Sequence, residues 1–151
     1  MVEQVRYEVD GWGVGELVFA DELLAWHELP AARGVPGGAH PLVERVRAYF
    51  RGSRDVFGDV ELELDWCTTF QRAALDAMRA IPYGETATYG EVAALAGHPH
   101  AHRAVGSVCA SNRFPLFVPC HRVVAADGLG SYGSLGPGYK RRLLELEGVL
   151  L

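Results

Sequence analysis

Residues 88–112 read TYGEVAALAGHPHAHRAVGSVCASN, and this stretch decides the fold that we expect. Thr88 and Glu91 have the spacing of a capping box, in which the two side chains bind free backbone N–H groups at a helix start. Apolar residues recur at helical spacing up to Gly97, and again up to about Asn112. Two short helices joined by a turn of about four residues make a helix-turn-helix candidate. Such pairs also occur in proteins that do not bind DNA, so the pattern alone leaves both interpretations open.

The sequence on either side of this pair predicts two more helices. Thr68 and Gln71 form another capping-box pattern, and apolar residues follow at helical spacing from Phe70 to Ile81. Near the end of the chain, Lys140–Gly148 is a leucine-rich segment that closes on a glycine. Residues 66–151 therefore read as a mostly helical unit.

The first 65 residues predict a small α/β unit. Apolar and polar residues alternate over 5–9, and short apolar runs follow at 14–19 and 23–27, which favours an antiparallel sheet. After an expected loop over 30–38, residues 42–50 place their apolar side chains on one helical face. We expect an α/β N-terminal subdomain over 1–65, followed by a mostly α domain over 66–151 with a winged helix-turn-helix-like core. Leu62 and Leu64 mark an extended passage between the two.

Composition narrows the class of protein. The 151 residues are 49% hydrophobic, enough for one compact core. The three cysteines have no CxxC spacing, so we expect neither a disulfide framework nor a cysteine-based metal site. We find no signal peptide and no membrane-length apolar run, and so expect a cytoplasmic protein without a membrane partner.

The net charge of −5 is unevenly distributed. Residues 1–65 carry 13 acidic and 6 basic side chains, whereas residues 66–151 carry 6 acidic and 8 basic ones. No acid lies between Glu91 and Asp127, and the arginines of that window are Arg103, Arg113 and Arg122. The window is suited to face phosphate, although a solvated face of mixed polarity would read the same way.

The second helix of the pair is slim on its expected outer side. Small residues occupy Ala104, Gly106, Ser107 and Ala110, and the one long donor is Arg103. A major-groove reader usually projects several long donors, so this face suits shape reading or a minor-groove contact.

Cys120 is the candidate nucleophile. It follows the apolar run Phe114–Val118 and precedes His121 and Arg122, which are a possible base and cation. A thiol needs such help because an isolated cysteine, with a pKa of about 8.5, is only slightly ionised at neutral pH. In an extended segment neighbouring side chains point to opposite faces, so His121 would have to act through a turn or a water. The alternative is an inert buried cysteine. Residues 127–138 then form a glycine-rich loop that could bring backbone amides to a planar ligand, or could be only a surface connection.

Taken together, six segments resemble the O6-alkylguanine-DNA alkyltransferases, in order and with similar spacing. They are Ile81–Gly84, Thr88–Ala93, Arg103–Gly106, Ser111-Asn112, Pro119–Val123 and Leu143–Gly148. The resemblance covers about residues 66–148 and rests most heavily on PCHRV with RAVG upstream. It implies repair of double-stranded DNA by irreversible, stoichiometric transfer of the alkyl group from O6-alkylguanine to Cys120, after nucleotide flipping.

The resemblance also implies a role for individual residues. The catalytic set is Cys120 as acceptor, His121 as base, Glu147 as its polarising carboxylate, and Tyr89 as donor to the departing guanine. The DNA-binding set is Arg103, as a finger that fills the gap in the base stack, with Ala104, Gly106, Ser107, Tyr89 and Arg113. The substrate-binding set is Tyr132 with Gly133 or Ser134 over the flipped base, Val123 through its carbonyl, and Asn112 as support.

Two departures from the family limit this transfer of roles. Residues 132–140 are about one residue longer than expected, so the donor to guanine O6 stays open between Gly133 and Ser134. Residues 1–66 contain no cysteine, so we expect neither the structural zinc of some members nor any other metal or cofactor. We expect a monomer, with cooperative binding to DNA left open.

Two alternatives belong to other functional classes. A relative that binds alkylated guanine without transferring the group would lack the cysteine, which is present here. A Cys-His hydrolase would give multiple turnovers and needs no Arg103.

Overall fold

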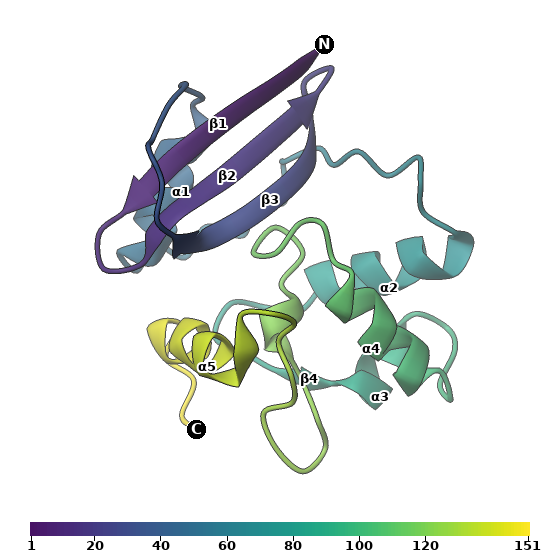
Figure 1. Ribbon diagram of the computed structural model, residues 1–151. Coiled ribbons are helices and arrows are strands. Elements are labelled where there is room, and N and C mark those ends of the chain that lie inside the picture. Colours follow the sequence, from purple (N-terminus) through teal and green to yellow (C-terminus); the bar gives the residue numbers. More distant parts are fainter.

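The computed structural model describes residues 1–151, and its first part is a three-stranded antiparallel sheet with one helix on its face (Figure 1). The strands are β1 (Val2–Val9), β2 (Gly13–Ala20) and β3 (Leu23–Ala32), in the order β1-β2-β3. Helix α1 (Leu42–Phe50) has the bounds that its apolar face predicts. The expected α/β unit is therefore confirmed.

Alternation of apolar residues explains why the sheet and α1 pack together. Val5 and Tyr7 of β1 are each 1% exposed, while Val46 and Tyr49 of α1 are fully buried. The predicted loop over 30–38 begins too early, because β3 continues through Pro30 to Ala32. Proline is tolerated there because β3 lies at the edge of the sheet, where a missing N–H breaks no ladder. The expected extended passage makes one isolated bridge, from Leu62 to Leu24.

Capping boxes begin two of the helices in the second part. Helix α2 (Thr69–Arg79) starts after Thr68, which exchanges both capping bonds with Gln71. Helix α3 (Tyr89–Leu95) starts after Thr88 in the same way, with Glu91 as partner. Each box contributes about 1 kcal/mol to helix stability.

Helix α4 (His102–Ala110) completes the helix-turn-helix, and α2 packs against both helices of the pair. The turn between α3 and α4 spans residues 96–101, longer than the four residues predicted. The reason is local: Gly97 has a left-handed φ of +86° that ends α3, and Pro99 delays the start of α4.

The last helix, α5 (Gly136–Leu146), begins four residues before the predicted start at Lys140. Proline near a helix start removes only an N–H that has no partner there, so Pro137 extends the helix backwards. The glycine-rich loop is correspondingly shorter. A two-residue parallel pair, β4 (Ala87–Thr88) with β5 (Val123–Val124), joins the start of α3 to the segment that carries Cys120.

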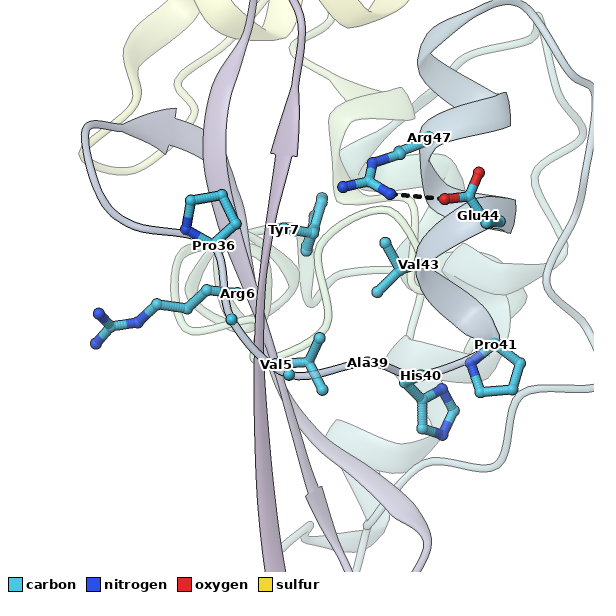
Figure 2. Close-up of a pocket in the computed structure, with 12 residues that line it drawn as sticks. Val5, Arg6, Tyr7, Pro36, Ala39, His40, Pro41, Val43, Glu44 and Arg47 are labelled. Atoms are coloured by element: carbon cyan, nitrogen blue, oxygen red, sulfur yellow. Dashed lines mark hydrogen bonds and ion pairs between the residues drawn. The ribbon is translucent and has the colours of Figure 1, made fainter.

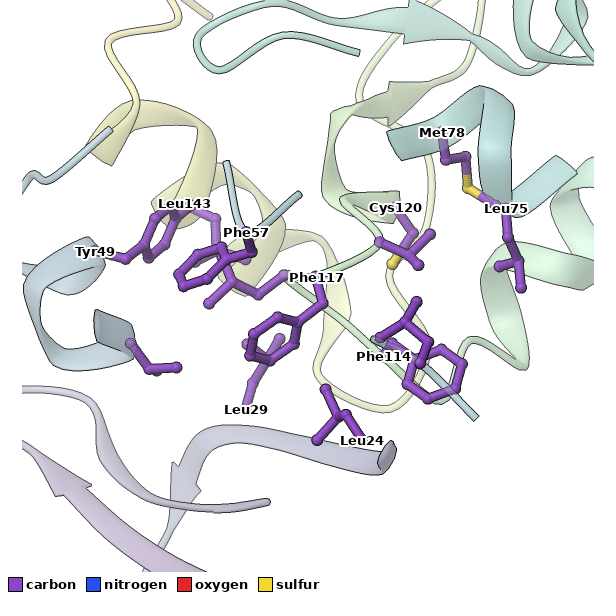
Figure 3. Packing of buried hydrophobic residues seen from close by; sticks show 14 of the residues in the cluster. Leu24, Leu29, Tyr49, Phe57, Leu75, Met78, Phe114, Phe117, Cys120 and Leu143 are labelled. Carbon is purple, nitrogen blue, oxygen red and sulfur yellow. The ribbon is translucent and has the colours of Figure 1, made fainter. Parts of the chain in front are cut away.

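One hydrophobic cluster of 31 buried residues runs through both parts of the chain (Figure 3). Phe57 joins them, because its ring centroid lies 6.4 Å from that of Tyr49 and 4.9 Å from that of Phe117. The domain division at residue 65 therefore stays a prediction. No helix combines the length and apolarity that crossing a membrane requires.

Candidate active site

Cys120 begins a short 3-10 turn, Cys120–Arg122, that follows the buried apolar run. The thiol residue is 5% exposed, and its backbone N–H donates to the Val118 carbonyl at 2.8 Å. Because a 3-10 turn has about three residues per turn, neighbouring side chains do not point to opposite faces as they would in a strand. Cys120 and His121 are therefore not held on opposite faces, as they would be in an extended segment.

His121 is fully buried and bonded to a carboxylate. Its Nε2 lies 2.7 Å from Oε2 of Glu147, although the two residues are 26 positions apart in the chain. Burial lowers the pKa of His121, while the bond to Glu147 acts to raise it. The imidazole is therefore neutral at neutral pH. A neutral ring that donates from Nε2 keeps its lone pair on Nδ1, and Nδ1 is buried without a protein partner.

Glu147 accepts hydrogen bonds from four residues that belong to three segments of the chain. Its Oε1 accepts from Nε of Arg122 at 2.8 Å and from the Gly84 N–H at 3.1 Å. Its Oε2 accepts from the Tyr49 hydroxyl at 2.5 Å and from Nη2 of Arg122 at 3.0 Å, besides the His121 contact. Burial acts to raise the pKa of Glu147, but the bonds from His121 and Arg122 hold it well below its usual range.

Arg122 is therefore not available to phosphate, which corrects one part of the charge prediction. It is 5% exposed, and its guanidinium is bound to Glu147 and to the Ile81 carbonyl at 2.9 Å. A buried arginine needs such partners because an unpaired charge in the interior is very costly. Its role here is to keep Glu147 ionised.

The Cys120 thiol opens into a pocket of about 250 Å³. Asn112, Tyr132, Gly133 and Ser134 line this pocket together with the thiol, so the structure brings these predicted residues to one place. Burial raises the pKa of the Cys120 thiol, whereas the Asn112 and Tyr132 side chains and the charge of Lys140 act to lower it. A thiol in this state is protonated at neutral pH and needs a base before it can attack.

A second thiol, Cys109, lines the same pocket. Burial raises its pKa to about 12, and its Sγ lies 3.5 Å from Sδ of Met78. The ionised form of Cys109 is therefore negligible at neutral pH, and the residue after it is Ala110, whereas Cys120 is followed directly by His121.

Asn112 ties the end of α4 to the active-site segment. Its Nδ2 donates to the Val118 carbonyl at 3.0 Å, and its Oδ1 accepts from the Phe114 N–H at 2.9 Å. The second bond spans two residues and is an Asx turn. Asn112 thus holds the chain that leads into Cys120.

The outer face of α4 carries the residues predicted to contact DNA. Arg103, Ala104 and Ser107 are exposed there, and Gly106 is half-buried beside them. Arg113 lies elsewhere: its guanidinium stacks 3.9 Å from the ring centroid of Trp66. Its contact with DNA stays a prediction.

Tyr89 and Val123 surround a buried lysine that the sequence reasoning missed. Lys140 is fully buried, and its Nζ donates to the carbonyls of Val123 at 2.5 Å and Ser131 at 3.1 Å. The same nitrogen lies 5.8 Å from the centroid of the Tyr89 ring. Composition could have drawn attention to this residue, because Lys140 is the one lysine among 14 basic residues.

A larger cleft of about 520 Å³ lies in the N-terminal part, between β1, residues 36–41 and α1 (Figure 2). It contains no cysteine, and its Arg47 and Glu44 pair with each other at 2.6 Å. The smaller pocket at Cys120 therefore holds the candidate chemistry. No group of three or more histidine, cysteine, aspartate or glutamate side chains is placed to hold a metal ion.

Comparison with known proteins agrees with this site. A family profile described as "6-O-methylguanine DNA methyltransferase, DNA binding domain" matches residues 69–149. The methylated-DNA–protein-cysteine methyltransferase of Methanopyrus kandleri is 47% identical over 112 residues, covering 74% of this chain and 82% of that protein. The enzyme of the same name from Mycobacterium tuberculosis H37Rv is 48% identical over 113 residues, covering 74% and 67%. The chain belongs to the 6-O-methylguanine DNA methyltransferase family.

Solved structures extend the similarity to the whole fold. The M. tuberculosis protein OGT, crystallised in complex with DNA, has a TM-score of 0.81 at 36% identity, covering 96% of this chain and 92% of its own. The O6-methylguanine-DNA methyltransferase of Pyrococcus kodakaraensis KOD1 has a TM-score of 0.72 at 25% identity, covering 99% and 100%. The N-terminal sheet, which lies outside the range covered by the sequence resemblance, thus shares the family fold.

Proposed function

We propose that this protein repairs DNA by direct reversal, moving the alkyl group of O6-alkylguanine irreversibly onto Cys120. The observation that carries the proposal is a buried Cys120 that opens into a pocket and is followed by an imidazole bonded to an ionised carboxylate. Membership of the methyltransferase family supports the same reaction. Each molecule reacts once, because the thioether that forms has no route to hydrolysis.

The chemical step begins with the thiol proton. His121 takes it at Nδ1 through a water, and the imidazolium that forms is stabilised by Glu147. The Cys120 sulfur then bonds to the alkyl carbon while the carbon–O6 bond breaks. The electron pair stays on the guanine, which gains a proton at a ring nitrogen. Tyr89 is the proposed donor of that proton.

The alkylated guanine can reach Cys120 only after it has left the stacked bases of the duplex. The nucleotide must therefore flip, at a cost of a few kcal/mol. Arg103 on the exposed face of α4 fills the gap, because a planar guanidinium can stack between bases. Ala104, Gly106 and Ser107 keep the helix slim enough to approach the groove closely. One chain supplies all of these groups, and we propose a monomer as the repairing unit.

The pocket holds the flipped base through main-chain and loop groups. A donor at Gly133 or Ser134 binds O6 as negative charge develops there, and both residues line the pocket with Tyr132. The carbonyls of Cys120 and Val123 accept the guanine amino group. The Val123 carbonyl, already bound by Lys140, still has a second lone pair for this contact.

Intact-mass measurement after incubation with duplex DNA containing O6-methylguanine tests the proposal. We expect a gain of one CH2 per protein molecule, mapped to Cys120, and no gain in Cys120→Ala that still binds the duplex. An unchanged mass with DNA bound would point to a binding-only relative. More than one product released per protein molecule would point to a hydrolase.

A further inference from the structure

The pocket at Cys120 has a wall that comes from the N-terminal sheet. Besides residues of α4 and of the segments 112–120 and 132–135, its lining includes Trp26, Glu28 and Leu29 of β3. The substrate contacts expected from the sequence all lie in the second half of the chain. The structure adds an aromatic residue, Trp26, from the first half.

Backbone and side-chain bonds hold this wall in place. The His27 N–H donates to the Arg113 carbonyl at 2.8 Å, and Nδ1 of His27 binds the Pro115 carbonyl at 2.6 Å. These bonds attach the outer edge of β3 to the chain that leads into Cys120. The bonds hold the β3 backbone beside the pocket, and Trp26 and Glu28 flank His27 on that strand.

The Trp26 ring is itself oriented. Its indole N–H donates to Oε1 of Glu28 at 2.8 Å, and the side chain stays 40% exposed. An indole left that accessible exposes apolar surface that a ligand can cover. The bond to Glu28 restricts the rotation of the ring, so less rotamer freedom is lost when a ligand packs on it.

Pocket size indicates which part of the substrate meets this wall. A cavity of about 150 Å³ is enough to hold one benzene molecule. The 250 Å³ here suits a purine near the thiol with its O6 substituent directed along the remaining space. A methyl group ends close to the sulfur that receives it, whereas an aryl-bearing group extends further along the pocket lining.

We propose that Trp26 is a specificity-determining residue that packs against O6 substituents larger than methyl, arylmethyl groups such as benzyl above all. The inference rests on the proposed function and deepens it by naming a substrate class. Trp26 touches the transferred group and takes no part in bond breaking. Its contribution is aromatic contact, which adds to the area that the ligand buries.

The test compares transfer rates on two duplexes that differ only in the lesion, O6-benzylguanine or O6-methylguanine, in single-turnover experiments read by intact mass. We expect Trp26→Ala to slow benzyl transfer by roughly 3- to 10-fold and to change methyl transfer by less than about twofold. Trp26→Phe, which keeps an aromatic ring, should retain most of the benzyl rate.

Val18→Ala is the matched control. Val18 is the cross-strand partner of Trp26 on β2 and lies outside the pocket lining. Its truncation therefore perturbs the same part of the sheet without changing the pocket wall. Equal losses on both lesions, an unchanged benzyl rate, or a faster one in Trp26→Ala would overturn the inference. If the unaltered protein gains no methyl mass, the proposed function fails, and the role of Trp26 fails with it.

Discussion

At the scale of single residues, Glu147 controls the charge of the site. It is 5% exposed, yet it remains ionised because Arg122 donates two hydrogen bonds and Gly84 another. The same carboxylate orients His121. A buried ion pair of this kind is weak support for stability, but it sets the protonation of a neighbouring base.

We therefore expect Glu147→Gln to slow alkyl transfer at neutral pH by roughly 10- to 100-fold. Without the carboxylate the imidazolium is less stable, so the apparent pKa of the Cys120 thiol rises and the rate curve moves to higher pH. Transfer from free O6-benzylguanine, followed by mass across the neutral and alkaline range, measures this. Tyr49→Phe is the control, because it removes a bond to the same oxygen and leaves the charge. An unchanged pH profile in Glu147→Gln would mean that Glu147 does not influence the ionisation of the thiol during transfer.

Cys109 supplies a second prediction about single residues. Burial raises its pKa to about 12, so it should not accept the alkyl group although it lines the pocket. We expect Cys109→Ala to take up one alkyl equivalent, and Cys120→Ala to take up none. Peptide mapping after reaction identifies the modified thiol. Alkylation of Cys109 in the unaltered protein would contradict this assignment.

At the scale of elements, α4 is the surface that should meet DNA. Arg103 is exposed on this helix, together with His102 and the small residues Ala104, Ser107 and Ala110. Arg103 is exposed and lies outside the lining of the pocket at Cys120, so its effect should depend on whether the guanine has to leave a duplex.

We expect Arg103→Ala to slow repair of duplex O6-methylguanine by roughly 10- to 100-fold, because flipping loses its stacking partner. Reaction with free O6-benzylguanine should change by less than about twofold, since nothing has to be flipped. Arg141→Ala is a charge-matched control on α5, where its partner Glu145 lies 4.0 Å away. Equal losses on both substrates would show that Arg103 does not act by filling the gap left by the flipped nucleotide.

At the scale of the whole molecule, His27 connects the N-terminal sheet with the active-site segment. Nε2 of His27 lies 2.5 Å from the Tyr7 hydroxyl of β1, and Nδ1 lies 2.6 Å from the Pro115 carbonyl. The ring is neutral in this chain of bonds: Nδ1–H donates to the carbonyl, and Nε2 accepts from the tyrosine. Burial lowers the pKa of His27 to about 4.

This lowered pKa makes stability depend on pH in a defined direction. Between an ordinary pKa of 6.5 and about 4, the unfolded chain binds a proton at His27 and the folded chain does not, so stability falls as pH falls. The loss is on the order of 3 kcal/mol and is complete below about pH 4. We expect His27→Gln, which does not titrate, to lose correspondingly less over this window in denaturant unfolding.

His121 also titrates with a lowered pKa, but it is present in both proteins and cancels in the difference. The result should therefore be read as the unaltered protein minus His27→Gln at each pH. Parallel curves for the two proteins would mean that His27 is not the group responsible.

Local patterns in the sequence predicted the elements well. The capping boxes at Thr68 and Thr88 mark their helices because each involves residues only three positions apart. Helix α1 was predicted to the residue for a similar reason, since its apolar face repeats within nine residues. Errors appeared at Pro30, where β3 continues along the edge of the sheet, and at Gly136, where a proline tolerated near the helix start begins α5 early.

The sequence by itself predicted the helix-turn-helix, because its capping box and apolar spacing lie within residues 88–112. The assignment of Cys120 as nucleophile and the pairing of His121 with Glu147 came from the resemblance of the motifs to the family, and the structure brings that pair into contact although it is 26 positions apart in the chain. Only the tertiary structure decided that the Arg122 guanidinium binds Glu147, that Lys140 is buried next to the Tyr89 ring, and that Trp26 lines the pocket. Those contacts join residues far apart in the chain. Their partners are chosen by packing and by the cost of leaving a buried charge or polar group unpaired, and no local pattern records that choice.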